Sequence, residues 1–81
     1  MDTKNQDFAD AVASELRAER GRQRITIAGV VVATGLSKSA VLMYLNGKRD
    51  IPLPAFFAIC DALDVSPRVI FERAEQIAHR D

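Results

Sequence analysis

The sequence predicts an all-α fold, a compact bundle of about five short helices, on three observations. Apolar residues recur at helical spacing in residues 8–16, 56–63 and 70–78. Residues that favour helix starts (Ser, Thr, Pro) and helix ends (Gly) lie between the apolar stretches. Residues 25–34 alone have the β-branched composition of a strand, and a lone strand would leave its backbone groups unpaired. We therefore expect this stretch also to be a short helix.

Length and composition predict one small domain over residues 1–81. Hydrophobic residues make up 48% of the chain, which is enough for a packed core. The single cysteine, Cys60, excludes an intramolecular disulfide and a multi-cysteine zinc site. No apolar run approaches the roughly 18 residues of a membrane span, and the polar N-terminus is unlike a signal peptide. The expected compartment is therefore the cytoplasm.

The formal net charge is zero, but the charges are segregated along the chain. Residues 1–16 and residues 50–81 each carry a net charge of −3. Residues 17–49 carry seven cations against Glu19 alone, a net charge of +6. A basic centre between acidic ends indicates an anionic partner for the middle segment. Surface charge that segregates without a function is the alternative.

The first three helices have recognisable ends. The first is expected to end near Gly21, because glycine favours helix C-termini. Thr26 is the expected N-cap of the second, which would end at Gly35. Ser37 is the expected N-cap of the third, which would run to about Asn46. The third helix should bury one face and expose the other, formed by Lys38, Ser39, Leu42, Met43 and Asn46.

Prolines mark the starts of the last two helices. Pro52 and Pro54 precede an apolar stripe that we expect to be buried, formed by Phe56, Ile59, Cys60 and Leu63. Ser66 and Pro67 have the order of an N-cap followed by a first-turn proline. Cys60 is therefore expected to act as a small buried hydrophobic residue.

Residues 26–46 have the layout of a helix-turn-helix. Two short helices, each apolar on one side, are joined by a tight turn at Gly35 and Leu36. In this motif the second helix enters the DNA major groove, and its first turn points at base edges. The N–H groups at its N-terminus also favour phosphate oxygens. The sequence therefore predicts an interface with double-stranded DNA.

The same segment resembles the Cro/C1-type (XRE-like) helix-turn-helix repressors, which include phage Cro proteins. The resemblance covers about residues 21–73. Its most specific part is the run at the end of the third helix and just after it, Tyr44-Leu45-Asn46-Gly47-Lys48-Arg49. It implies a lambda-repressor-like domain of four or five helices that binds operator DNA, usually as a dimer.

The resemblance also implies which residues contact DNA. The start of the recognition helix maps to Ser37, Lys38 and Ser39, which are expected at bases and adjacent phosphates. The expected contacts of its next turn are Leu42 and Met43, those of the following loop are Asn46, Lys48 and Arg49, and those at the start of the second helix are Thr26 and Ile27.

Three apolar residues depart from the family pattern. Relatives commonly have a polar residue at Ile27, where it holds a phosphate, and tend to have polar residues at Leu42 and Met43. Apolar side chains cannot hydrogen-bond base edges, although they can contact a thymine methyl group. We therefore expect readout to depend on Lys38, on phosphate contacts and on DNA shape.

Arg20, Arg22 and Arg24 are expected between the first two helices, either solvated or clamping the DNA backbone. His79, the only histidine, has no partner that would support catalysis, and residues 29–37 lack the spacing of a phosphate loop. We therefore predict that the protein is not an enzyme and that it has no cofactor and no metal site.

The sequence as a whole predicts a sequence-specific double-stranded-DNA-binding transcriptional regulator. The expected form is a small repressor that binds a pseudo-palindromic operator as a homodimer, at least on DNA. The expected dimer surfaces are the fifth helix and the acidic tail, especially Val69, Arg73, Ile77 and nearby residues. The alternative is a protein-interaction module, such as an antitoxin or an anti-repressor, because Ile27, Leu42 and Met43 are apolar.

Overall fold

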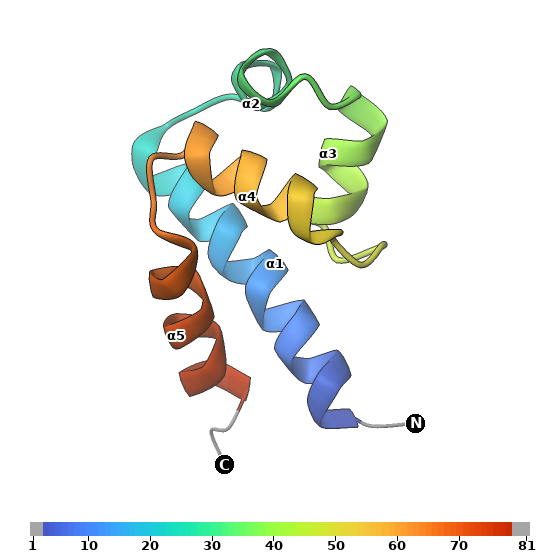
Figure 1. The fold of residues 1–81 in the computed structure, drawn as a ribbon, viewed down its shortest axis with the longest axis vertical. Helices are drawn as coiled ribbons and strands as arrows, with labels where there is room; N and C mark the ends of the chain where they lie inside the picture. The colour runs from blue at the N-terminus through green and yellow to red at the C-terminus, as the bar shows by residue number, and fades with distance from the viewer. Residues whose placement is uncertain (1–2, 79–81) are drawn as a thin grey trace.

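The computed structural model describes residues 3–78, and these residues form five α-helices and no strand (Figure 1). The all-α prediction is confirmed, including a helix in the β-branched stretch. In Figure 1, α1 and α5 lie side by side, α4 crosses the middle of the molecule, and α2 and α3 form its upper end. His79 lies outside the described residues. The helices are α1 (Thr3–Gln23), α2 (Ile27–Thr34), α3 (Lys38–Leu45), α4 (Leu53–Ala62) and α5 (Pro67–Ala78).

The N-caps predicted for α2 and α3 are confirmed. The Thr26 hydroxyl accepts a hydrogen bond from the backbone N–H of Gly29 at 3.0 Å. The Ser37 hydroxyl accepts one from the N–H of Ala40, also at 3.0 Å. Each cap satisfies one of the N–H groups that a helix start leaves without a partner. Between them, Gly35 ends α2 in the left-handed conformation, with φ of 73°.

The sequence predicts that α1 ends near Gly21, and the helix continues two residues beyond it, to Gln23. A helical glycine costs only about 1 kcal/mol relative to alanine, so tertiary contacts can override it. The carboxylate of Glu19 accepts hydrogen bonds from Arg22 and Gln23 and thereby stabilises the last turn. The left-handed residue that ends the helix is Arg24, with φ of 56°. A non-glycine residue rarely adopts this conformation, so no sequence pattern predicts it at this position.

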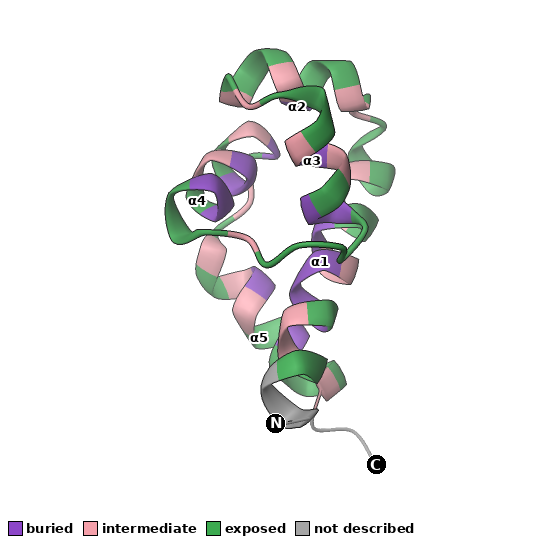
Figure 2. Ribbon diagram, turned by 90° about the vertical axis from the view of Figure 1, so that its right-hand side faces the viewer, coloured by how far each residue is buried: buried purple, intermediate pink, exposed green. Residues whose placement is uncertain are grey.

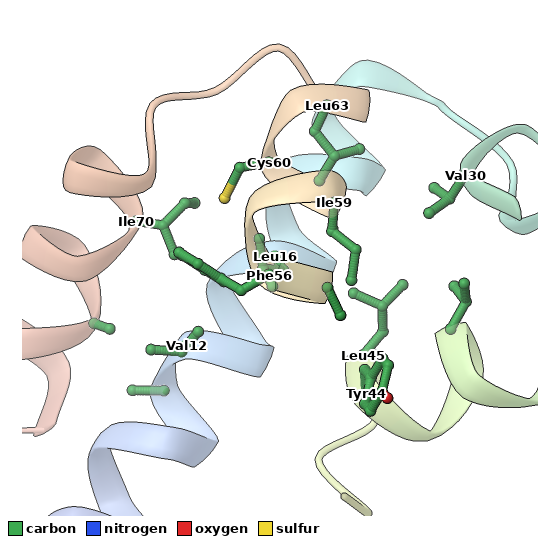
Figure 3. Packing of buried hydrophobic residues seen from close by; sticks show 14 residues of the cluster. Val12, Leu16, Val30, Tyr44, Leu45, Phe56, Ile59, Cys60, Leu63 and Ile70 are labelled. Carbon is green, nitrogen blue, oxygen red and sulfur yellow. The ribbon is translucent and has the colours of Figure 1, made fainter. Parts of the chain in front are cut away.

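The core joins all five helices (Figure 3). The ring of Phe56 in α4 stacks on that of Phe71 in α5, with centroids 4.8 Å apart. The stripe predicted for residues 56–63 is buried, as expected. Burial raises the pKa of the Cys60 thiol to about 11, which keeps the group protonated and unreactive. The largest fully buried side chains are Leu16, Val30, Val41, Phe56, Ile59, Cys60, Leu63 and Ile70.

Candidate nucleic-acid interface

The chain bends by 115° between α2 and α3, and residues 35–37 form the turn. This angle lies within the range of about 90–120° that helix-turn-helix units adopt across turns of three or four residues. Among the described residues, no single helix is long and apolar enough to cross a membrane. Within the same residues, α2 and α3 have the length and apolar composition of a membrane span only when they are taken together, and the sharp bend separates them. The geometry is that of a helix-turn-helix with α3 as its second helix.

The first turn of α3 presents polar groups to solvent. Lys38 and Ser39 are both exposed, and Ser37 lies directly before them. The first backbone hydrogen bond of the helix joins the N–H of Val41 to the carbonyl of Ser37, at 3.0 Å. The N–H groups of Lys38 and Ser39 precede that bond and are therefore oriented to donate to an anion at the helix start. The predicted contact residues at this end of α3 lie together on the surface.

The rest of α3 divides into the two predicted faces, with one correction. Val41, Tyr44 and Leu45 are buried, as expected. Met43 is 41% exposed and can contact a thymine methyl group. Leu42, expected on the outer face, is only partly exposed, although it is not among the residues that pack against the buried core.

The loop after α3 holds the other predicted cations. Gly47 adopts φ of 70°, and the N–H of Lys48 donates to the carbonyl of Met43 at 2.9 Å, as in a Schellman cap. Lys48, Arg49 and Asn46 are exposed in this loop, which crosses the face turned to the viewer in Figure 2. The Arg49 guanidinium lies 5.8 Å from the centroid of the Tyr44 ring, which limits its range of orientations.

Two of the three arginines predicted between the first helices lie inside α1 instead. Arg20 donates a hydrogen bond from Nη1 to the carbonyl of Ile25 at 2.9 Å, and its Nε is buried with no partner among the described residues. Arg22 pairs with Glu19 at 2.7 Å. Only Arg24 follows the helix, so the expectation of three loop arginines is corrected to one. Arg20 holds the segment that leads into α2.

A further arginine positions the other end of the recognition helix. Nη1 of Arg17 in α1 donates a hydrogen bond to the carbonyl of Leu45, the last residue of α3. Helix C-termini leave such carbonyls without partners and favour cations. Sequence reasoning missed this contact, because nothing in a linear pattern pairs residues that are 28 positions apart.

These contacts change the meaning of the basic segment. Of its seven cations, Arg17, Arg20 and Arg22 bind groups of the protein itself. Helix α2 contains no charged residue. The cations that lie around the helix-turn-helix and form no ion pair among residues 3–78 are Arg24, Lys38, Lys48 and Arg49.

Glu19 links α1 to α5. Its carboxylate accepts hydrogen bonds from Arg22 and Gln23, each at 2.7 Å, and from Arg73 of α5 at 3.1 Å. These donors, Arg22 first, lower the pKa of Glu19 from its usual 4.5 to about 2. Arg73, which the sequence placed on the expected dimer surface, is therefore engaged within the subunit.

Comparison with known families agrees with this geometry. A family model described as a helix-turn-helix domain matches residues 11–70, which are 60 of the 81 residues. The match begins within α1, includes α2, α3 and α4, and ends in the first half of α5. No curated protein and no solved structure gives a significant match to the chain. Among the described residues, no cluster of three or more His, Cys, Asp or Glu side chains is arranged to hold a metal ion.

Proposed function

Since the chain belongs to the helix-turn-helix domain family, we propose that it is a sequence-specific double-stranded-DNA-binding transcriptional regulator, and specifically a small repressor of the Cro/C1 type. The observation that carries the proposal is the first turn of α3. Ser37 caps this turn, and Lys38 and Ser39 are exposed on it. The other end of α3 is held by the hydrogen bond from Arg17. A rigid helix with a polar, exposed first turn is what major-groove readout requires.

Each exposed group has a role in this proposal. Lys38 donates to guanine O6 and N7 or to the adjacent phosphate, and Ser39 bonds a neighbouring base edge or phosphate. Met43 contacts a thymine methyl group. The backbone is held by Arg24 and by the N-terminus of α2, where the capping hydroxyl of Thr26 lies on the surface. The loop residues that complete the phosphate contacts are Asn46, Lys48 and Arg49.

Repression follows from occupancy of the promoter. Two subunits on one face of the DNA would place their recognition helices about 34 Å apart, one helical turn. The operator is then pseudo-palindromic, and the bound homodimer blocks polymerase sterically. The few cations around α3 keep the sequence-independent phosphate contribution small, so that specificity depends on a small number of base contacts.

Random-site selection with the purified protein would identify the operator. Fluorescence anisotropy should then show that Lys38→Ala weakens operator binding by roughly tenfold or more and weakens random-sequence binding less. Arg68→Ala is the matched control, because Arg68 is an exposed cation on α5, across the molecule from α3 (Figure 1). Equal losses on both DNAs for Lys38→Ala would assign that side chain to phosphate contact.

The salt dependence of binding tests the loop. Arg49→Ala should weaken binding to every sequence and reduce the slope of log K against log salt by about one unit. The control Arg22→Ala removes a cation that is paired with Glu19, and it should leave the slope unchanged. No binding to any duplex at low salt, where electrostatic attraction is strongest, would overturn the proposal as a whole.

A protein-interaction module remains the second candidate because one observation favours it. Val32 on α2 is 84% exposed, and Met43 on α3 is 41% exposed. Exposed apolar side chains on a helix-turn-helix can contact another protein as well as DNA. Absence of DNA binding together with capture of a protein partner that Val32→Ser abolishes would favour this candidate over a repressor.

A further inference from the structure

The first half of α4 carries the most exposed large apolar side chains outside the helix-turn-helix among the described residues. Leu53 is 60% exposed and Phe57, one turn later, is 50% exposed. Leu53 also lines an open hollow of about 460 Å³ between α1, α4, α5 and the loop before α4. The apolar lining of the hollow includes Phe8, Val12, Ile51, Phe56 and Phe71. We call Leu53, Phe57 and this hollow the α4 patch.

The α4 patch combines features that suit self-association. It places protruding apolar side chains beside an apolar hollow, so that one copy can supply both parts of a contact to another. The charges that border it are few and of both signs, namely Arg49, Asp50 and Asp10. A second copy with the same mixed border meets little net repulsion, whereas a partner with a single strong charge would be repelled by one of the two signs.

We propose that the α4 patch is the surface through which two copies of this chain associate. The loop that carries Lys48 and Arg49 leads directly into α4, so the patch adjoins the candidate DNA interface. A two-fold axis here would set two α3 helices on the same side of the dimer. This placement of the two α3 helices rests on the proposed function. The self-association itself does not, because it requires no DNA.

The fifth helix, which the sequence predicts as the dimer surface, offers less exposed apolar surface than the α4 patch. Arg73 is paired with Glu19 of the same subunit, and Val69 is partly buried. Ile77, 42% exposed, is the one large apolar side chain on α5 that is exposed among the described residues. A small, transient interface buries up to about 600 Å² on each partner, roughly a ninth of the 5383 Å² surface. Two large apolar side chains and a hollow supply the centre of such an interface, and a single isoleucine does not.

Sedimentation velocity without DNA tests the proposal directly. The wild-type protein should form a dimer across a concentration series that reaches roughly 1 mM. The double variant Leu53→Ser/Phe57→Ser should raise the dissociation constant by at least about tenfold. Ile77→Ser, the matched control on α5, should leave it unchanged. A wild-type protein that is monomeric throughout, or dissociation caused by Ile77→Ser instead, would overturn the assignment.

Disulfide trapping tests the same surface without loss of apolar contact. Leu53→Cys should give an oxidised dimer faster than Ile77→Cys, because the proposed contact brings residue 53 of the two copies together. The native Cys60 is buried and does not compete. Equal rates at the two positions would contradict a contact at the α4 patch. Thermal unfolding of each variant checks that the fold is retained.

DNA binding separates this proposal from the proposed function. On a single half-site the double variant should bind as the wild type does, and on the full palindrome it should lose the cooperative gain in affinity. If the wild type dimerises through the patch but binds no DNA, the repressor proposal fails and the dimer surface stands. If DNA binding and cooperativity are both unchanged in the double variant, the α4 patch is not the dimer surface.

Discussion

The α1–α5 pair and the α2–α3 pair are stabilised in different ways. Helices α1 and α5 lie side by side over much of their length, with the rings of Phe8 and Phe71 5.8 Å apart and Glu19 bound to Arg73 at 3.1 Å. Helices α2 and α3 have eight residues each, and α2 buries only Val30. Helices this short are marginal on their own, so caps and contacts from α1 matter more to them.

The difference assigns separate tasks to the two regions. Apolar burial around α1, α4 and α5 supplies most of the stability, whereas α2 and α3 keep their outer faces exposed. Their position is held by the caps Thr26 and Ser37 and by hydrogen bonds from Arg17 and Arg20. Stability and binding can therefore be altered independently, and the following substitutions test that independence.

The largest effect is expected in the core. Phe56→Ala should lower the free energy of unfolding by about 3–5 kcal/mol, because the side chain is 2% exposed and stacks on Phe71. A domain of this size has roughly 4–12 kcal/mol in total, so urea unfolding should show a protein close to its limit. The adjacent Phe57→Ala, at a half-exposed position, should cost less than about 1 kcal/mol. Similar losses at the two positions would contradict the described core.

Two glycine substitutions should have opposite signs in the two regions. Gly35→Ala places a side chain at φ of 73° and should destabilise the turn by about 1–2 kcal/mol. Gly21→Ala lies in the helical part of α1, where an added methyl group meets no atom within 4 Å. It should stabilise the protein by about 0.5–1 kcal/mol. Thermal unfolding of both variants measures the signs, and a stabilising Gly35→Ala would contradict the left-handed turn.

Ser37 separates stability from binding at a single position. Ser37→Ala removes the cap of α3 and should cost about 1 kcal/mol in urea unfolding. Ser37→Asp keeps an N-cap acceptor and places a negative charge at the helix start, so stability should be retained. That charge would repel phosphate, and operator affinity should fall in anisotropy measurements. An aspartate variant that binds DNA as tightly as wild type would remove this end of α3 from the interface.

Features fixed by neighbouring residues could be predicted from the sequence. The caps Thr26 and Ser37 and the left-handed Gly35 are local, because each depends on a few residues of backbone. The helical state of residues 27–34 followed from the absence of a pairing strand, despite unfavourable propensity. These local signals were sufficient to place the helix-turn-helix.

Features fixed by distant contacts could not be predicted. The basic segment suggested arginines available to DNA, but Arg17 binds the carbonyl of Leu45, 28 positions away, which only the folded chain brings near. Leu53 and Phe57 lie outside the predicted apolar stripe, and their exposure depends on which surfaces the neighbouring helices leave uncovered. Which residues of the candidate interface contact DNA stays a prediction from the family resemblance.

The smallest effect concerns acid stability and belongs to the α1–α5 pair. The lowered pKa of Glu19 means that its ionised form is favoured in the folded protein, so its contribution is present above the unfolded pKa of about 4.5. That contribution is lost as the pH falls toward about 2, the folded pKa. Because the side chains of Arg22 and Arg73 are about half exposed, screening reduces the contribution of Glu19 to below about 1 kcal/mol.

Glu19→Gln should therefore lower stability at neutral pH and flatten its decline between pH 4.5 and about 2. Urea unfolding across this range measures both effects. Glu72→Gln is the control, because Glu72 is an exposed acid on α5 that forms no ion pair among residues 3–78. Operator affinity at neutral pH should be unaffected by either variant, since neither residue belongs to the candidate DNA interface. A loss of affinity in Glu19→Gln alone would mean that the α1–α5 pair also determines the position of the recognition helix.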